Sequence, residues 1–111
     1  MSCYITELSV RRGTTPTLAF SVDIDLTVFE KVHVAFLENR HLLVKEGDDI
    51  RFYKREDGGT NVVVTLSQAD TLSWKEGKAV EVQVRYKRGE KADASSIGVL
   101  QIERLLEEGE I

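Results

Sequence analysis

The chain of 111 residues is long enough for one hydrophobic core and too short for two. Its 41% hydrophobic and 31% charged residues exclude a disordered chain, and its net charge of −4 excludes a general attraction to nucleic acid. The single cysteine excludes an internal disulfide and a cysteine-rich metal site. We therefore expect one domain over residues 1–111, with no nucleic-acid partner.

The first ten residues, MSCYITELSV, lack the basic start and the long apolar run of a signal peptide. No apolar stretch of the sequence approaches the roughly 20 residues that cross a membrane. We expect no signal peptide, no transmembrane segment and no membrane partner. The protein is then made and kept in the cytoplasm.

Two arginines, Arg11 and Arg12, end the first predicted strand. A turn at residues 13–15 follows them, and Pro16 starts the second strand, where its missing N–H does least harm. One interpretation makes the arginines solvated residues at the end of a strand. The other makes them a contact for an anion or a partner, beside the threonine hydroxyls of the turn.

Alternation of apolar and polar residues predicts the second strand and the hairpin that follows it. From Leu18 to Ile24 every second side chain is apolar, as in a sheet with one buried face. Residues 32–37 and 41–46 then form the two strands of a hairpin, because Asn39–Arg40 supplies a turn between them.

Two further turns, at residues 47–49 and 57–59, separate the next strands, since their glycines and aspartates tolerate positive φ. The run LSQADTLSWKEG then breaks the alternation, with Ser67 placed to cap a helical turn and Asp70 three residues later. We interpret this run as a crossing between strands in which Trp74 plugs the end of the core. An exposed Trp74 would instead indicate a platform on which sugars stack.

The clearest strand of the chain is KAVEVQVRYK, and the last strand changes face near Gly98, which suggests a bulge or a close contact there. Eight short strands separated by turns predict an all-β fold, an immunoglobulin-like two-sheet antiparallel β-sandwich with one short helical turn. Its shared core should contain Leu18, Phe20, Val22, Val34, Phe36, Val64, Leu66, Val80, Val82 and Val84.

Residues that could carry chemistry are sparse. His33 and His41 lie on successive strands but lack the third protein ligand that zinc needs. Asp23 and Asp25 share a strand face without a cleft that would hold a substrate between them. Two acidic turns lack the ligand spacing of a calcium site. We predict no catalytic residue, no cofactor and no bound metal.

The edges of the predicted sheets suggest an interface. Leu42 and Leu43 are adjacent, so one of them should point away from the core, and few charges interrupt the apolar residues around Ile97 and Val99. We expect self-association or docking through the hairpin at residues 30–46 or through the C-terminal strand. A closed homo-oligomer is the default arrangement.

Four segments of the chain, RRGTTPTLAFSVDIDL, KVHVAFLENRHLLVKEG, VVVTLSQADTLSWKEGKAVEVQVRY and IGVLQIERLLEEGEI, together resemble a known family. The most telling pieces are Arg12–Gly13 with Pro16 before an alternating strand, and the crossing Leu66–Thr71 followed by Gly77 and a second alternating strand. The chain resembles small proteins of phages and prophages of Gram-positive bacteria, similar to the N-terminal sandwich domain of the phage baseplate upper protein.

The resemblance implies a non-enzymatic structural component of a phage or prophage tail that contacts other tail proteins. Such a protein is present in the host cytoplasm during assembly and afterwards in the virion tail. Because the sequence ends at Ile111, we expect it to lack the receptor-binding or shaft region of longer relatives. The alternative is a free-standing carbohydrate-binding or adhesion module, for which Trp74 and the tyrosines would have to form an exposed stacking face.

Overall fold

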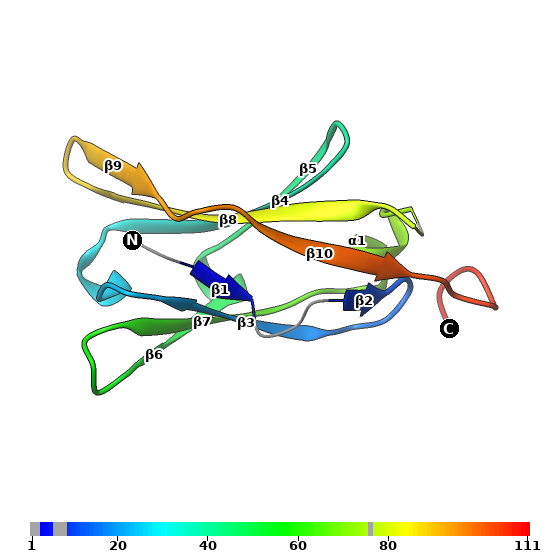
Figure 1. Cartoon of the computed structure of the whole chain (residues 1–111), viewed down its shortest axis with the longest axis horizontal. Helices are drawn as coiled ribbons and strands as arrows, with labels where there is room; N and C mark the ends of the chain where they lie inside the picture. The colour runs from blue at the N-terminus through cyan, green and yellow to red at the C-terminus, as the bar shows by residue number, and fades with distance from the viewer. Residues whose placement is uncertain (1–2, 6–8, 76) are drawn as a thin grey trace.

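Two β-sheets lie face to face in the computed structural model, which describes residues 3–5, 9–75 and 77–111. The strands run along the long axis of a body that measures 44 × 28 × 23 Å (Figure 1). The four-stranded sheet has the order β1–β3–β7–β6, with β1 at Cys3–Ile5, β3 at Thr17–Val22, β7 at Thr60–Thr65 and β6 at Ile50–Lys54.

The six-stranded sheet has the order β2–β10–β8–β4–β5, and a further strand, β9, pairs with β8. Its strands are β2 at Ser9–Arg11, β10 at Gly98–Glu103, β8 at Ala79–Arg88, β4 at Lys31–Glu38, β5 at His41–Glu46 and β9 at Lys91–Ala94. The helical turns are η1 at Leu26–Val28, η2 at Gly47–Asp49 and α1 at Gln68–Leu72.

The strand order is that of an immunoglobulin domain, which places strands A, B, E and D in one sheet and C, F and G in the other. Strands β1, β3, β7 and β6 take the first four places, and β4, β8 and β10 take the other three. Strand β5 extends the second sheet beside strand C, as in variable-type domains. The predicted immunoglobulin-like β-sandwich is confirmed.

The first predicted strand is divided between the two sheets. Strand β1 pairs antiparallel with β3, and β2 pairs parallel with β10, so that Arg11 lies opposite Glu103. Residues 6–8, which connect β1 to β2, lie outside the described residues. The remaining strand pairs that the structure describes are antiparallel. Strands β1 and β2, which are neighbours in the sequence, therefore form one edge of each sheet.

The core lies between the sheets and contains every residue that the alternation predicted for it. Phe20 of β3 and Phe36 of β4 meet across the two layers, with ring centroids 6.2 Å apart. Trp74 is only 1% exposed, and its indole packs against Phe36 with the ring centroids 5.7 Å apart. The prediction that Trp74 plugs the end of the core is confirmed.

Strand β3 ends at Val22, earlier than its alternation predicted. The carboxylate of Asp25 accepts a hydrogen bond of 3.0 Å from the Thr27 backbone N–H and starts the helical turn η1. Aspartate competes with strand pairing in this way because its short side chain reaches nearby backbone groups. Ile24 is consequently half-buried against the core and lies outside the strand. The predicted face change near Gly98 coincides with the residue at which β10 begins.

Candidate functional site

The outer face of the six-stranded sheet exposes a group of large apolar side chains. Strand β4 buries Val32, Val34 and Phe36, so the alternation points Leu37 outward. Leu42 of β5 is 64% exposed, and Ile97, which precedes β10, is 56% exposed. We name this group the outer patch, and its members are Leu37, Leu42, Val44, Ile97 and Val99.

The strand register brings the outer patch together. Leu37 lies opposite Leu42 across the β4–β5 pair and opposite Glu81 across the β4–β8 pair. Glu81 in turn lies opposite Val99 of β10. A shallow hollow of about 130 Å³ is lined by Leu37, Leu42 and Ile97 together with their neighbours on β4 and β8. Segments that are more than 50 residues apart in the sequence thus bring apolar side chains to one hollow on the outer face of the sheet.

Three of the residues predicted for an interface, Leu42, Ile97 and Val99, lie in the outer patch. Leu43 does not, because its side chain points to the inner face of β5 and packs against the core. Strand β5 is an edge strand, as predicted. In the C-terminal strand, β2 covers Gln101–Glu103 on the side of β10 that faces away from β8, whereas Gly98–Leu100 pair with β8 alone among the described strands. Docking through the C-terminal strand stays a prediction.

Sequence reasoning missed Leu37 and Val44 as members of the outer patch. For Leu37 the signal was present, since Phe36 and Leu37 are adjacent apolar residues in an alternating strand, as Leu42 and Leu43 are in the next. Val44 lies opposite Ala35 and becomes an outward residue once the hairpin register is fixed.

Arg12 joins the crossing that follows α1 to the C-terminal tail. Its Nη2 donates a hydrogen bond of 2.8 Å to the Leu72 carbonyl, and its Nε donates to the Trp74 carbonyl. Its Nη1 pairs with the carboxylate of Glu108 in the C-terminal tail. The interpretation as a solvated residue is wrong for Arg12, whose side chain is 17% exposed, because its guanidinium is directed at the protein's own oxygens.

Arg11 fits the solvated interpretation better. Its side chain is exposed, with Nη2 2.9 Å from Glu103 Oε2 and Nη1 2.6 Å from the Arg104 carbonyl. The Thr14 hydroxyl, which we considered as part of an anion site, donates instead to the Arg11 carbonyl at 2.7 Å. The anion or partner contact of Arg11 and Arg12 stays a prediction.

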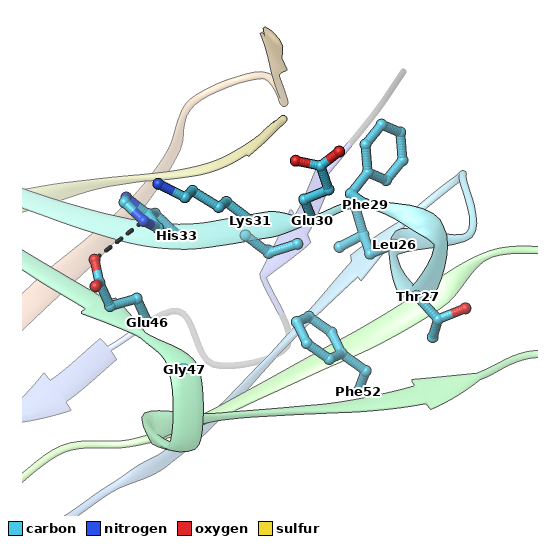
Figure 2. Close-up of a pocket in the computed structure, with 10 residues that line it drawn as sticks. Leu26, Thr27, Phe29, Glu30, Lys31, His33, Glu46, Gly47 and Phe52 are labelled. Atoms are coloured by element: carbon cyan, nitrogen blue, oxygen red, sulfur yellow. Dashed lines mark ion pairs between the residues drawn. The ribbon is translucent and has the colours of Figure 1, made fainter. Parts of the chain in front are cut away.

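A larger hollow, of about 530 Å³, opens between the sheets where β4 begins (Figure 2). Leu26 of η1 and Phe52 of β6 give it apolar walls. At its rim His33 Nε2 lies 3.0 Å from Glu46 Oε2. No serine or cysteine is among the residues that line the hollow, so it offers His33 no side chain to activate as a nucleophile.

The two histidines are far apart along the hairpin. His33 lies opposite Glu46 at one end of β5, whereas His41 lies opposite Glu38 at the other. Among the described residues no group of three or more histidine, cysteine, aspartate or glutamate side chains is placed to hold a metal ion.

In the acidic turn after β6, the Asp57 carboxylate accepts hydrogen bonds from the Gly59 N–H and from the Arg55 side chain, and these bonds lower the pKa of Asp57.

Two of the described aromatic side chains that an exposed stacking face for sugars would need, Trp74 and Tyr86, are buried, whereas Tyr53 on β6 is 53% exposed. Tyr4 lies in β1, where the structure describes no side chain. The hypothesis of a sugar platform on Trp74 is therefore wrong, because the indole belongs to the core.

Comparisons with known proteins show little likeness. No family model matches the chain, and no curated protein matches it. A solved structure described as "Anomalous substructure of Titin-A168169" is similar at 17% identity and a TM-score of 0.36. The match covers 94% of this chain and 48% of that chain, so this chain spans about half the length of the titin fragment. Within the described residues, no helix has the length and apolar character that crossing a membrane requires.

Proposed function

We propose that this protein is a non-enzymatic assembly module that acts by protein–protein contact, as a structural component of a phage or prophage tail. The observation that carries the proposal is the outer patch. The tail assignment is supported by the resemblance of the alternating strands and the Leu66–Thr71 crossing to baseplate proteins.

The outer patch has the composition of an interface centre. Contiguous apolar surface on a soluble domain often marks a binding site, and burying a leucine, valine or isoleucine side chain is worth about 1.5–3 kcal/mol. Two polar residues on the outer face of β8, Glu81 and Gln83, lie between the members of the patch on β4 and β5 and those at β10. Protein–protein interfaces combine apolar contacts with a small number of hydrogen bonds, which these two side chains could supply.

Incorporation into particles tests the proposal. In the lysogen that encodes the chain, we expect an epitope-tagged copy to co-purify with intact tails in a density gradient. A Leu42→Lys/Ile97→Lys variant should fold but be lost from the particles, because both charges enter the outer patch. Leu106→Lys is the matched control, since Leu106 is also exposed but lies in the C-terminal tail.

Two results would contradict the proposal. The gene could lie outside any phage or prophage region, which would remove the tail assignment at once. Alternatively, particles could form with a full complement of the doubly substituted chain, which would show that the outer patch makes no contact in the tail.

A further inference from the structure

Among the described strands, β5 pairs with β4 alone, so one of its edges is open. It ends the six-stranded sheet and pairs with β4 through a two-residue turn at Asn39–Arg40, where Asn39 takes a φ of 56°. The residues that flank such a turn, Glu38 and His41, form a hydrogen-bonded pair. Non-hydrogen-bonded and hydrogen-bonded pairs then alternate along the two strands. The backbone groups of residues 42, 44 and 46 therefore face away from β4, and the hairpin tip projects beyond the two layers (Figure 1).

The middle of this edge lacks the charges that usually protect an edge strand. Lys45 points to the inner face, where its ammonium lies 2.9 Å from the Asp70 carboxylate and its side chain is only 17% exposed. Leu42, Leu43 and Val44 are thus consecutive with no charge among them. Strand β6, at one edge of the four-stranded sheet, carries the exposed residues Arg51 and Lys54.

We propose that a second copy of this chain pairs antiparallel with β5 along this edge, with the two-fold axis at Leu43. This register places Leu42 opposite the second copy's Val44 on the outer face, and Arg40 opposite the second copy's Glu46. Both apolar pairs and both opposite-charge pairs repeat across the axis. The proposal deepens the proposed function, on which it rests, by naming a partner for Leu42 and Val44, the members of the outer patch that lie on β5.

The two neighbouring symmetric registers are less complementary. Side chains must keep to their own faces, so these registers centre on Leu42 and on Val44. The first would place Arg40 opposite Val44 on the outer face, and the second would place Glu46 opposite Leu42 there. In the Leu43-centred register His41 lies opposite the second copy's Lys45, whose charge is balanced by Asp70 of its own chain.

Analytical ultracentrifugation from one to several hundred micromolar tests the pairing. We expect a monomer–dimer equilibrium in the natural chain and a weakening of at least tenfold in Arg40→Glu, which faces Glu46 with a like charge. The double variant Arg40→Glu/Glu46→Arg restores the opposite charges and should recover the dimer. Tyr53→Lys on the β6 edge is the control and should dimerise as the natural chain does.

Cross-linking tests the register. In a Cys3→Ser background, Leu43→Cys places two thiols on residues that face each other in a non-hydrogen-bonded pair, with Cα atoms about 4.5 Å apart. That separation suits a disulfide, which needs about 4.4–6.8 Å. Val44→Cys is the matched control, because the two copies of residue 44 are offset diagonally. We expect an oxidised dimer from the first variant and little from the second.

A chain that stays monomeric at several hundred micromolar would overturn the inference, as would a dimer that Arg40→Glu leaves intact. Efficient cross-linking through Val44→Cys but not Leu43→Cys would overturn the register. A monomeric chain that still enters tail particles would reject this pairing and leave the proposed function standing. A dimer that never enters particles would contradict the proposed function and leave this pairing standing.

Discussion

Phe20 shows how much of the stability rests on single core side chains. Its ring is fully buried and contacts Phe36 of the opposite sheet. Phe20→Ala should lower the free energy of unfolding by about 3–5 kcal/mol, because it removes apolar contacts and leaves a cavity. Chemical denaturation measures the change, with the exposed aromatic Tyr53→Ala as control. Equal midpoints for the two variants would show that the Phe20 ring is not in the core.

Arg12 is a second residue whose substitution should lower the free energy of unfolding. Arg12→Leu removes the charge-assisted hydrogen bonds to the carbonyls of Leu72 and Trp74, and we expect a loss of about 1.5–3 kcal/mol. Arg11→Ala, at an exposed ion pair, should cost less than about 1 kcal/mol. The denaturant midpoints of the two variants make the comparison, and equal values would refute a clamping role for Arg12.

The helical turn α1 is the element whose formation depends most on its cap. The Ser67 hydroxyl accepts from the Asp70 N–H at 3.1 Å, and the Asp70 carboxylate accepts from the Ser67 N–H at 2.9 Å. Ser67→Ala should cost about 1 kcal/mol. Thermal unfolding would reveal the effect, and Ser67→Asn should largely retain the stability, since asparagine also caps helices well. A loss of the same size in both variants would contradict the capping role.

The same element makes stability depend on pH. Burial raises the pKa of Asp70, but the hydrogen bond from the Ser67 N–H and the Lys45 ammonium outweigh it, so the pKa lies below its usual value of 3.8. A carboxyl with a lowered folded pKa stabilises the fold above its unfolded pKa and loses that contribution as pH falls through the folded value. Between roughly pH 5 and pH 2, Asp70→Asn should therefore lose less stability than the natural chain. The free energy of unfolding is measured by chemical denaturation at several pH values. An equal loss in the natural chain and in Asp70→Asn over that range would contradict this expectation.

At the scale of the whole molecule, alternation was enough to predict the sandwich. Each strand of the core has one buried face, so the period of two identified the inward residues from Leu18 to Val84 without knowledge of their partners. The division of the first strand between two sheets could not be predicted in this way. A short segment joins whichever sheet edge lies beside it, and here those edges are β3 and β10. The residues of the segment itself do not indicate where these two strands lie.

The outer patch was only partly predictable for a related reason. Adjacent leucines showed that one side chain must leave the core. Leu42 and Ile97 line the same hollow, however, only because β4 and β8 lie between β5 and β10 in the sheet. Arg12 was misread because its partners, Leu72, Trp74 and Glu108, are about 60 or more residues away. Long-range partners of a polar side chain leave no local pattern.

The parallel pairing of β2 with β10 also determines how the molecule responds to tension. A force that draws β2 toward the N-terminus and β10 toward the C-terminus pulls the two strands in opposite directions along their shared axis. Their hydrogen bonds then share the load and must rupture together, whereas an antiparallel pair pulled from one end would open bond by bond. Arg11 adds its own bonds to Glu103 and Arg104 beside this junction. If the chain is anchored at both ends in an assembly, the β2–β10 pair resists the load in shear. The lifetime of the folded domain under load is then set by the rate at which these hydrogen bonds rupture.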